Sequence, residues 1–211
     1  TVPATDALPD GDDAANEAGA RVGLPVMVKA SWGGGGRGMR RVYDADKLAD
    51  EVSAAKREAA AAFGKDDVYL EKLIERARHV EIQVFGDTHG NVTHLFEGDC
   101  SVRRRNQKVV EMAPATWLDE ETRQGMCQAA VRLAKESGYQ NAGTVEFLYD
   151  VNDGAFYFIE VNPRIQVEHT VTEEVTSVDI VKAQLLIAGG ATLEEAGIPS
   201  AEADRRPRGV A

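Results

Sequence analysis

Apolar residues recur along this chain with two different spacings, and each spacing predicts a different kind of element. Within residues 46–63, Leu48, Val52, Ala55 and Ala59 are separated by three or four positions, which predicts an amphipathic helix. The same spacing predicts helices at residues 12–21, 119–137 and 178–188, and a helical turn at 192–196.

The second spacing is an alternation of polar and apolar residues, which predicts half-buried strands. Residues 79–85 alternate in this way, and a turn at 86–91 leads into residues 92–96, so we expect an antiparallel hairpin. A second hairpin is expected from residues 143–150 and 155–162. Further strands are predicted at residues 26–30, 39–43 and 68–72. Helices mixed with antiparallel strands indicate the α+β class.

The second hairpin and the residues just after it contain charged and polar side chains that suggest a binding site. Its turn lies about midway between Glu146 and Glu160, so the two carboxylates are expected nearly opposite each other, where they repel unless a cation lies between them. Alternation along an extended segment adds Asn162 and Arg164 to the same face as Glu160. Carboxylates with an amide suit Mg²⁺, and a guanidinium suits a small oxyanion. The alternative is a solvated edge strand with a surface salt bridge.

Two further segments suggest anion binding. Residues 33–38 contain five glycines between two apolar strands, which favours a mobile hairpin whose backbone N–H groups cover phosphates over a flexible linker. No helix follows directly, so this is neither a P-loop nor a dinucleotide fingerprint. Residues 99–108 form a dense basic run. This run is either a solvated loop or a cationic face for a polyanion such as a nucleotide triphosphate, and its composition leaves both readings open.

Composition limits the classes of partner. With a net charge of −11 over 211 residues, general affinity for nucleic acids or anionic membranes is not expected. Cys100 and Cys127 form no CxxC pair, and no signal peptide or membrane-spanning run is present, which favours a reduced intracellular compartment. The chain begins at Thr1, not at Met, and ends in what reads as the start of a strand, so we expect a piece of a longer protein.

These motifs together resemble the biotin carboxylase component of biotin-dependent carboxylases, a branch of the ATP-grasp superfamily, and among those enzymes the pyruvate carboxylases most. The similarity runs from about Gly23 to Ala188. It rests mainly on GGGGRGM at residues 33–39 and EVNPRIQVEHTVTE at residues 160–173. Shorter matches lie at residues 29–31, 71–72, 78–81, 99–101, 106–111 and 143–147.

The resemblance implies an ATP-grasp fold in which two α+β subdomains grip ATP and the glycine hairpin is a lid. We expect a linker and helix at residues 1–22, the lid subdomain at 23–97 and a metal and bicarbonate subdomain at 98–190. Residues 191–211 are then the start of a C-terminal segment. The family's N-terminal domain and the rest of its C-terminal segment are absent from this sequence.

The resemblance also assigns roles to residues. Lys29 matches the family's lysine that contacts the α- and β-phosphates of ATP, and His79 lies at the position where the family contacts the ribose. Glu146, Glu160 and Asn162 match the ligands of Mg²⁺ or Mn²⁺. The other expected nucleotide contacts are Gly33, Gly34, Gly35, Gly36, Gly38, Met39, Glu71, Lys72, Leu73, Arg103 and Gln107. The expected bicarbonate pocket consists of Lys108, Arg164, Gln166, Val167 and Glu168, of which Lys108, Arg164 and Glu168 are catalytic and Glu168 is the general base.

The implied activity is that of an ATP-dependent ligase. Bicarbonate attacks the γ-phosphorus of ATP, and the resulting carboxyphosphate delivers CO₂ to biotin on a carrier domain. The implied setting is a homo-oligomeric enzyme of the cytoplasm, or of the mitochondrial matrix in a eukaryote. Two alternatives are a nucleotide-binding module that is catalytically silent in isolation, and an enzyme of the carbamoyl-phosphate synthetase type. Two residues depart from the family pattern: Arg103 stands where glutamine is expected, and Gly98 stands where arginine is usual.

Overall fold

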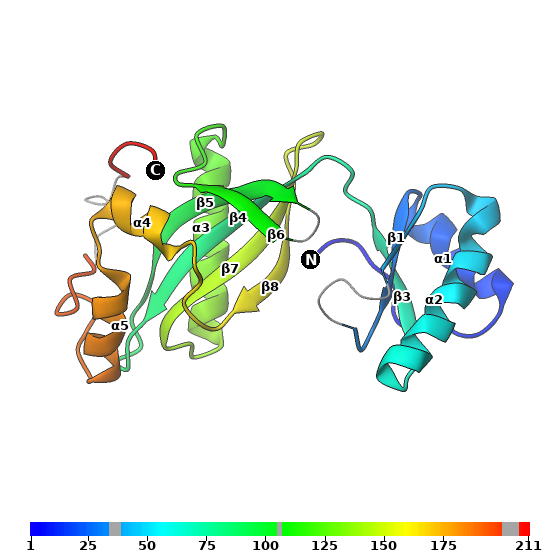
Figure 1. Ribbon diagram of the computed structural model, residues 1–211, viewed down its shortest axis with the longest axis horizontal. Coiled ribbons are helices and arrows are strands. Elements are labelled where there is room, and N and C mark those ends of the chain that lie inside the picture. The colour runs from blue at the N-terminus through cyan, green and yellow to red at the C-terminus, as the bar shows by residue number, and fades with distance from the viewer. Residues whose placement is uncertain (34–38, 105–106, 200–206) are drawn as a thin grey trace. The chain divides into compact units, whose positions relative to one another are not determined.

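The computed structural model describes residues 1–33, 39–104, 107–199 and 207–211, and these residues form two compact units, Thr1–Glu75 and Arg76–Ala211 (Figure 1). Gly34, Gly35, Gly36 and Gly38, which the sequence assigned to a phosphate-covering hairpin, lie outside the described residues. The boundary between the units differs from the one expected at residues 97/98. The reason is that residues 77–97 pair with the strands of the second unit.

Unit 1 is a three-stranded antiparallel sheet with helices packed on one face. Its elements are α1 (Asp12–Val22), β1 (Val26–Ala30), β2 (Arg40–Val42), η1 (Ala45–Lys47), α2 (Leu48–Phe63) and β3 (Val68–Lys72), in the sheet order β2-β1-β3. Val26, Val28 and Leu70 point to the helices and are fully buried. Alternation therefore places Lys29 and Glu71 on the opposite face.

The first ten residues are not the linker that we expected at the start of the chain. Thr5 N–H donates to the carbonyl of Leu70 at 2.8 Å, and Leu8 N–H donates to that of Val68 at 2.7 Å. Val2 and Leu8 are buried. The stretch therefore runs along the edge of β3, where it satisfies backbone groups of an edge strand.

Unit 2 is a five-stranded antiparallel sheet in the order β6-β5-β4-β7-β8. Both predicted hairpins are confirmed, whereas β6 and α4 were not predicted. Of the basic run, residues 99–104 end β5 and residues 107–108 begin β6. The elements are β4 (Ala77–Gly86), β5 (Val92–Arg104), β6 (Gln107–Met112), α3 (Glu120–Glu136), β7 (Asn141–Asp150), β8 (Phe156–Asn162), α4 (His169–Thr176) and α5 (Ile180–Ala188).

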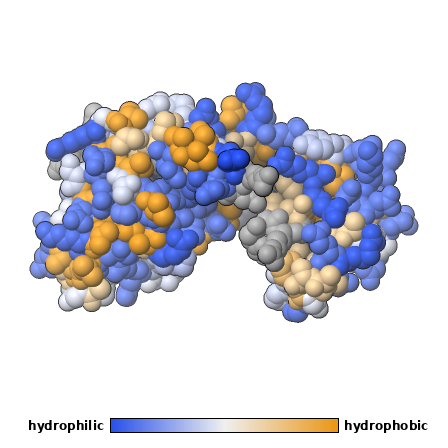
Figure 2. All heavy atoms as spheres, in the orientation of Figure 1, coloured by the Kyte–Doolittle hydropathy of each residue, from blue (hydrophilic) through white to orange (hydrophobic). Residues whose placement is uncertain are grey.

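Helix α3 covers one face of this sheet. Part of the opposite face carries polar side chains. Small residues such as Ala130 on α3 pack against Ile82, Val145 and Phe147 of the sheet, and all four are buried. Elsewhere the visible surface of both units is mostly hydrophilic (Figure 2). Among the described residues, no helix combines the length and apolar character needed to cross a membrane.

A β-bulge in β8 decides which side chains reach the polar face. Phe147 pairs with Phe158, whereas Glu146 pairs with Glu160, so Ile159 is an extra residue on β8. In a regular strand Phe158 and Glu160 would share one face. Because of the bulge, Phe158 packs on the α3 side while Glu160 joins Glu146 on the opposite face.

We expect deletion of Ile159 to be tolerated, since the shortened strand alternates regularly and still places Glu160 opposite Glu146. The loss in free energy of unfolding should stay below about 1 kcal/mol because Ile159 is 36% exposed. Deleting Val161 instead breaks the alternation and should cost about 3 kcal/mol or more. Urea denaturation of the two variants measures both values, and equal losses would contradict this role of the bulge.

Candidate functional site

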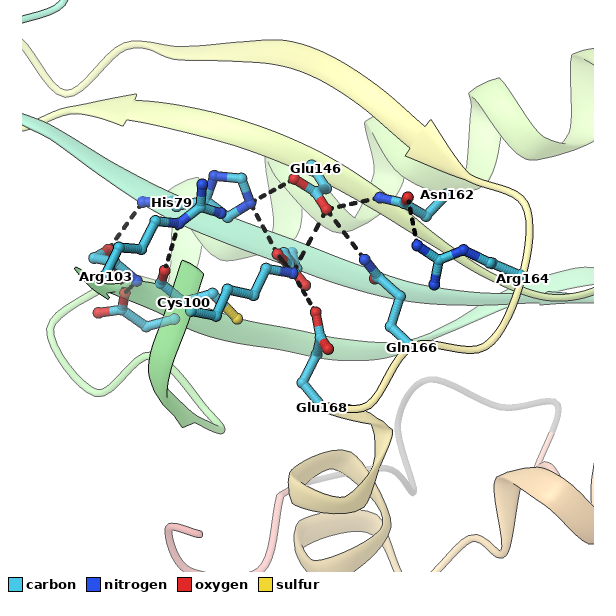
Figure 3. A network of polar contacts seen from close by, with 12 residues as sticks. His79, Cys100, Arg103, Glu146, Asn162, Arg164, Gln166 and Glu168 are labelled. Carbon is cyan, nitrogen blue, oxygen red and sulfur yellow. Dashed lines mark hydrogen bonds and ion pairs between the residues drawn. The ribbon is translucent and has the colours of Figure 1, made fainter. Parts of the chain in front are cut away.

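The polar face of the unit 2 sheet brings together buried and half-buried ionisable residues from three strands and one loop. His79 and Glu81 come from β4, and Glu146 comes from β7 directly opposite Glu81 in the register. Lys108 reaches them from β6, and Glu168 from the segment that precedes α4 (Figure 3). The sequence predicted all of these except Glu81, which is 4% exposed.

Lys108 is the cation at the centre of this group. Its Nζ forms ion pairs with the carboxylates of Glu81 and Glu168 and lies 3.6 Å from Oε1 of Glu146. Burial alone would lower the pKa of Lys108, but the carboxylates outweigh it and raise that pKa above its usual range. Burial likewise favours a raised pKa for Glu168, yet the contact with Lys108 lowers it. Glu168 is therefore held ionised beside Lys108.

His79 lies between two carboxylates. Its Nε2 is 2.8 Å from Oε1 of Glu81 and 2.6 Å from Oε2 of Glu146. One N–H group cannot point at both oxygens, and neither contact has ideal hydrogen-bond direction. Burial favours a lowered pKa for His79, but Glu146 and Glu81 raise it. Burial would raise the pKa of Glu146, and His79 and Lys108 together bring it below its usual range.

The predicted facing of Glu146 and Glu160 is confirmed by the strand register. Glu146 is buried, and Asn162 Nδ2 donates to its Oε1 at 2.7 Å. Glu160 is exposed, and among the described residues its carboxylate has neither a hydrogen bond nor an ion pair. Two carboxylates and an amide oxygen at the edge of one face are a donor set that fits Mg²⁺ or Mn²⁺. The metal role of these residues remains a prediction.

The structure brings only part of the predicted bicarbonate pocket together. Gln166 is buried, and its Nε2 lies 3.3 Å from Glu146 Oε1, so it joins Lys108 and Glu168. Arg164 is exposed and donates to the Ile165 carbonyl at 3.2 Å and to Asn162 Oδ1 at 3.4 Å. Val167 is 88% exposed. Arg164 therefore lies at the exposed edge of the site, to which its hydrogen bond with Asn162 connects it.

Among the predicted nucleotide contacts of unit 1, Lys29 and Glu71 meet on the open face of the sheet and form an ion pair. The side chain of Lys72 points to the opposite face, where Nζ donates to the carbonyls of Gly23 at 2.9 Å and Leu24 at 3.0 Å. Its contribution to a nucleotide site would come from its backbone. Of the remaining residues, Gly33 follows β1, Met39 is 43% exposed before β2, and Leu73 follows β3.

The two departures from the family pattern lie on β5. Gly98 pairs with Glu81, and a Cβ at Gly98 would lie 3.3 Å from the Met112 carbonyl oxygen, so the close approach of β6 leaves little room for a side chain. Arg103 is exposed near the end of β5, and Gln107 is exposed at the start of β6.

Residues 1–196 match the family described as the ATP-binding domain of the carbamoyl-phosphate synthase L chain, which is most of the 211 residues. This chain belongs to that family. The pyruvate carboxylase of Bacillus subtilis is 55% identical over 192 residues, which is 91% of this chain and 17% of that protein. The human mitochondrial pyruvate carboxylase is 51% identical over 197 residues, which is 93% of this chain and 17% of that protein.

Solved structures of this family agree with the fold. A pyruvate carboxylase from Rhizobium etli matches with a TM-score of 0.84 and 58% identity, over 100% of this chain and 18% of that one. The biotin carboxylase domain of 2-oxoglutarate carboxylase from Hydrogenobacter thermophilus, in complex with MgADP, ADP and bicarbonate, matches with a TM-score of 0.84 and 47% identity, over 100% of this chain and 45% of that one. The predicted ATP-grasp fold class and the resemblance to biotin carboxylases are confirmed.

Replacing Lys108 by Met should destabilise the chain by about 3 kcal/mol near neutral pH, because buried carboxylates lose their cation. Lys108 depresses the pKa of Glu146 and Glu168, so its stabilisation is fully present above the ordinary glutamate pKa of 4.5 and is lost as the pH falls through the lowered pKa values of the folded state. The deficit of the variant should therefore shrink in acid. Urea denaturation across this pH range measures it, with the exposed Lys182→Met as control.

A deficit that is equal at neutral and acid pH would show that Lys108 acts through packing and not through its charge.

Proposed function

We propose that this chain supports ATP- and Mg²⁺-dependent carboxylation of biotin by bicarbonate through carboxyphosphate, in the branch of pyruvate carboxylases. The chain spans 17% of the length of the first two relatives named above, so the activity of a whole enzyme goes beyond what the comparisons cover. The observation that carries the proposal is the ion pair of Lys108 with Glu168. The opposed carboxylates Glu146 and Glu160 form the other side of the same group of residues.

The geometry supports a division of labour on this face. Glu168 is ionised beside the ammonium group of Lys108. It remains a strong enough base to accept the proton of bicarbonate. As that proton moves to Glu168, the electrostatic attraction that binds Glu168 to Lys108 weakens, and Lys108 becomes available to the bicarbonate anion. The freed oxygen of bicarbonate then attacks the γ-phosphorus, and ADP leaves.

The remaining residues supply charge and position. Glu146, Glu160 and Asn162 would hold Mg²⁺, which offsets the negative charge that builds up on the transferring phosphoryl group. In unit 1, Lys29 would exchange Glu71 for a phosphate oxygen. In unit 2, Gln166 holds the carboxylate of Glu146 in place. Arg164 would contact bicarbonate from the rim.

The acceptor of the carboxyl group would be biotin on a carrier domain, in a homo-oligomeric enzyme of the cytoplasm or mitochondrial matrix. An enzyme of the carbamoyl-phosphate synthetase type would instead need ammonia, and the named family includes that chemistry. The high identity to pyruvate carboxylases favours biotin. Dependence of turnover on biotin and not on ammonia distinguishes the two.

We expect Glu160→Ala to weaken binding of MgATP to this chain by about tenfold, because one of the metal's ligands is lost. Binding of ATP without Mg²⁺ should not change. Isothermal calorimetry with and without Mg²⁺ measures both, and the exposed Glu174→Ala on α4 is the matched control. Equal MgATP affinities of the two variants would contradict the metal role of Glu160, and a folded parent that binds no MgATP would contradict the proposal for this chain.

A further inference from the structure

The paired strands β5 and β6 exchange faces between Asp99 and Lys108. Asp99 pairs with Met112, and four residues further along each strand Arg103 pairs with Lys108. Regular alternation places residues four apart on one face of a strand. The carboxylate of Asp99 lies on the face covered by α3, where it accepts from Trp117 Nε1 at 2.6 Å. Lys108 nevertheless reaches the carboxylates of the opposite, polar face.

Two irregularities in the pairing account for this exchange. Between Asp99 and Val102, β5 has one residue more than β6, and between Val102 and Arg103, β6 has the extra residue Val109. Because each strand gains one residue, the register of Arg103 with Lys108 is restored, but the alternation of both strands is reversed. Lys108 thereby turns from the α3 side to the polar face.

Asp99 holds the irregular segment of β5, residues 100 and 101, against the core. Its Oδ1 accepts from the Ser101 N–H at 2.9 Å and from the Ser101 hydroxyl. Its Oδ2 accepts from Arg78 Nη1 at 2.9 Å and from Trp117 Nε1. The residue is 3% exposed, so these are buried, charge-assisted contacts. They connect the irregular segment to residues on the α3 side of the sheet.

Ser101 extends this connection to β4. The consecutive pairing of β4 with β5 reaches Val80 and Asp99, and the next N–H group of β4, that of His79, donates to the Ser101 hydroxyl at 2.9 Å. A side-chain oxygen thus satisfies a backbone donor where the regular ladder ends. The hydroxyl fixes the place at which β5 leaves β4.

We propose that Asp99 is a positioning residue of the site: through Ser101 it fixes the paired irregularities that turn Lys108 to the polar face. Its meaning for catalysis rests on the proposed function, in which Lys108 is the cation beside Glu168. Asp99 acts from the α3 side of the sheet and touches none of the groups assigned to substrate, so it influences the reaction only through the position of Lys108.

The test compares Asp99→Asn with Glu97→Gln. Glu97 is 1% exposed and lies two residues earlier on the same face of β5, but it accepts from Arg123 Nε and the Ala115 N–H, away from the irregular segment. Both variants lose one buried negative charge from one strand, so a general loss of stability affects both. The position of Lys108 is followed by NMR of its ¹⁵N-labelled ammonium group, assigned through the loss of the signal in Lys108→Met.

We expect the Lys108 signal to be retained in Glu97→Gln and to be lost or shifted in Asp99→Asn. An amide has one acceptor oxygen, so in either orientation its NH₂ group faces donors that the carboxylate of Asp99 accepted. Bicarbonate-dependent release of phosphate from MgATP, measured where the variants are fully folded, should fall about 100-fold in Asp99→Asn alone.

A second pair of variants keeps the test decisive if Asp99→Asn does not fold. Ser101→Ala leaves the contacts of Asp99 with Arg78 and Trp117 in place and removes only the hydroxyl. It should shift the Lys108 signal in the same direction. Ser101→Thr restores the hydroxyl and should return the signal toward that of the parent.

An unchanged Lys108 signal in Asp99→Asn and Ser101→Ala, or equal changes in Asp99→Asn and Glu97→Gln, would overturn the inference. A parent without bicarbonate-dependent release of phosphate would overturn the proposed function instead, and the NMR comparison would still decide whether Asp99 positions Lys108.

Discussion

The ammonium group of Lys108 is the contact on which the polar face of unit 2 depends. It meets Glu81 from β4 and Glu168 from the segment before α4, and it lies 3.6 Å from Glu146 on β7. Three carboxylates at this depth would repel one another and lose their hydration without a cation among them. The pairing of β6 with β5 positions that cation, so the charge balance of the site depends on the order of the strands in the sheet.

This arrangement has a consequence for binding. The cations that an anionic substrate needs are already occupied: Lys108 by carboxylates, and Lys29 in unit 1 by Glu71. Under the proposed function, a phosphate or bicarbonate would have to replace those carboxylates, and protonation of Glu168 would release Lys108. Exposed groups such as Glu160 and Arg103 are exceptions, since among the described residues neither has an ion pair. They are the groups most ready to meet a metal or an anion.

The sequence predicted what periodicity and local motifs can show. Alternation and turn position placed Glu146 opposite Glu160, and helical spacing found the helix that covers the sheet. It could not reveal the bulge at Ile159, because an extra residue on one strand is defined only by its partner strand. Glu81 was missed since an acidic residue in an alternating strand reads as solvent-facing, and only the long-range pairing with β7 buries it. The side chain of Lys72 lies on the helix-covered face, where it donates to the carbonyls of Gly23 and Leu24 after α1, a long-range contact that local sequence patterns do not reveal.

The most direct test of a bicarbonate-phosphorylating site is to follow an oxygen atom. The chain is incubated with MgATP and bicarbonate labelled with heavy oxygen, and the released inorganic phosphate is analysed by mass spectrometry. Attack of bicarbonate on the γ-phosphorus predicts phosphate that is released only when bicarbonate is present and that contains one bicarbonate oxygen. Phosphate without the label, or no release from a chain that binds MgATP, would contradict it.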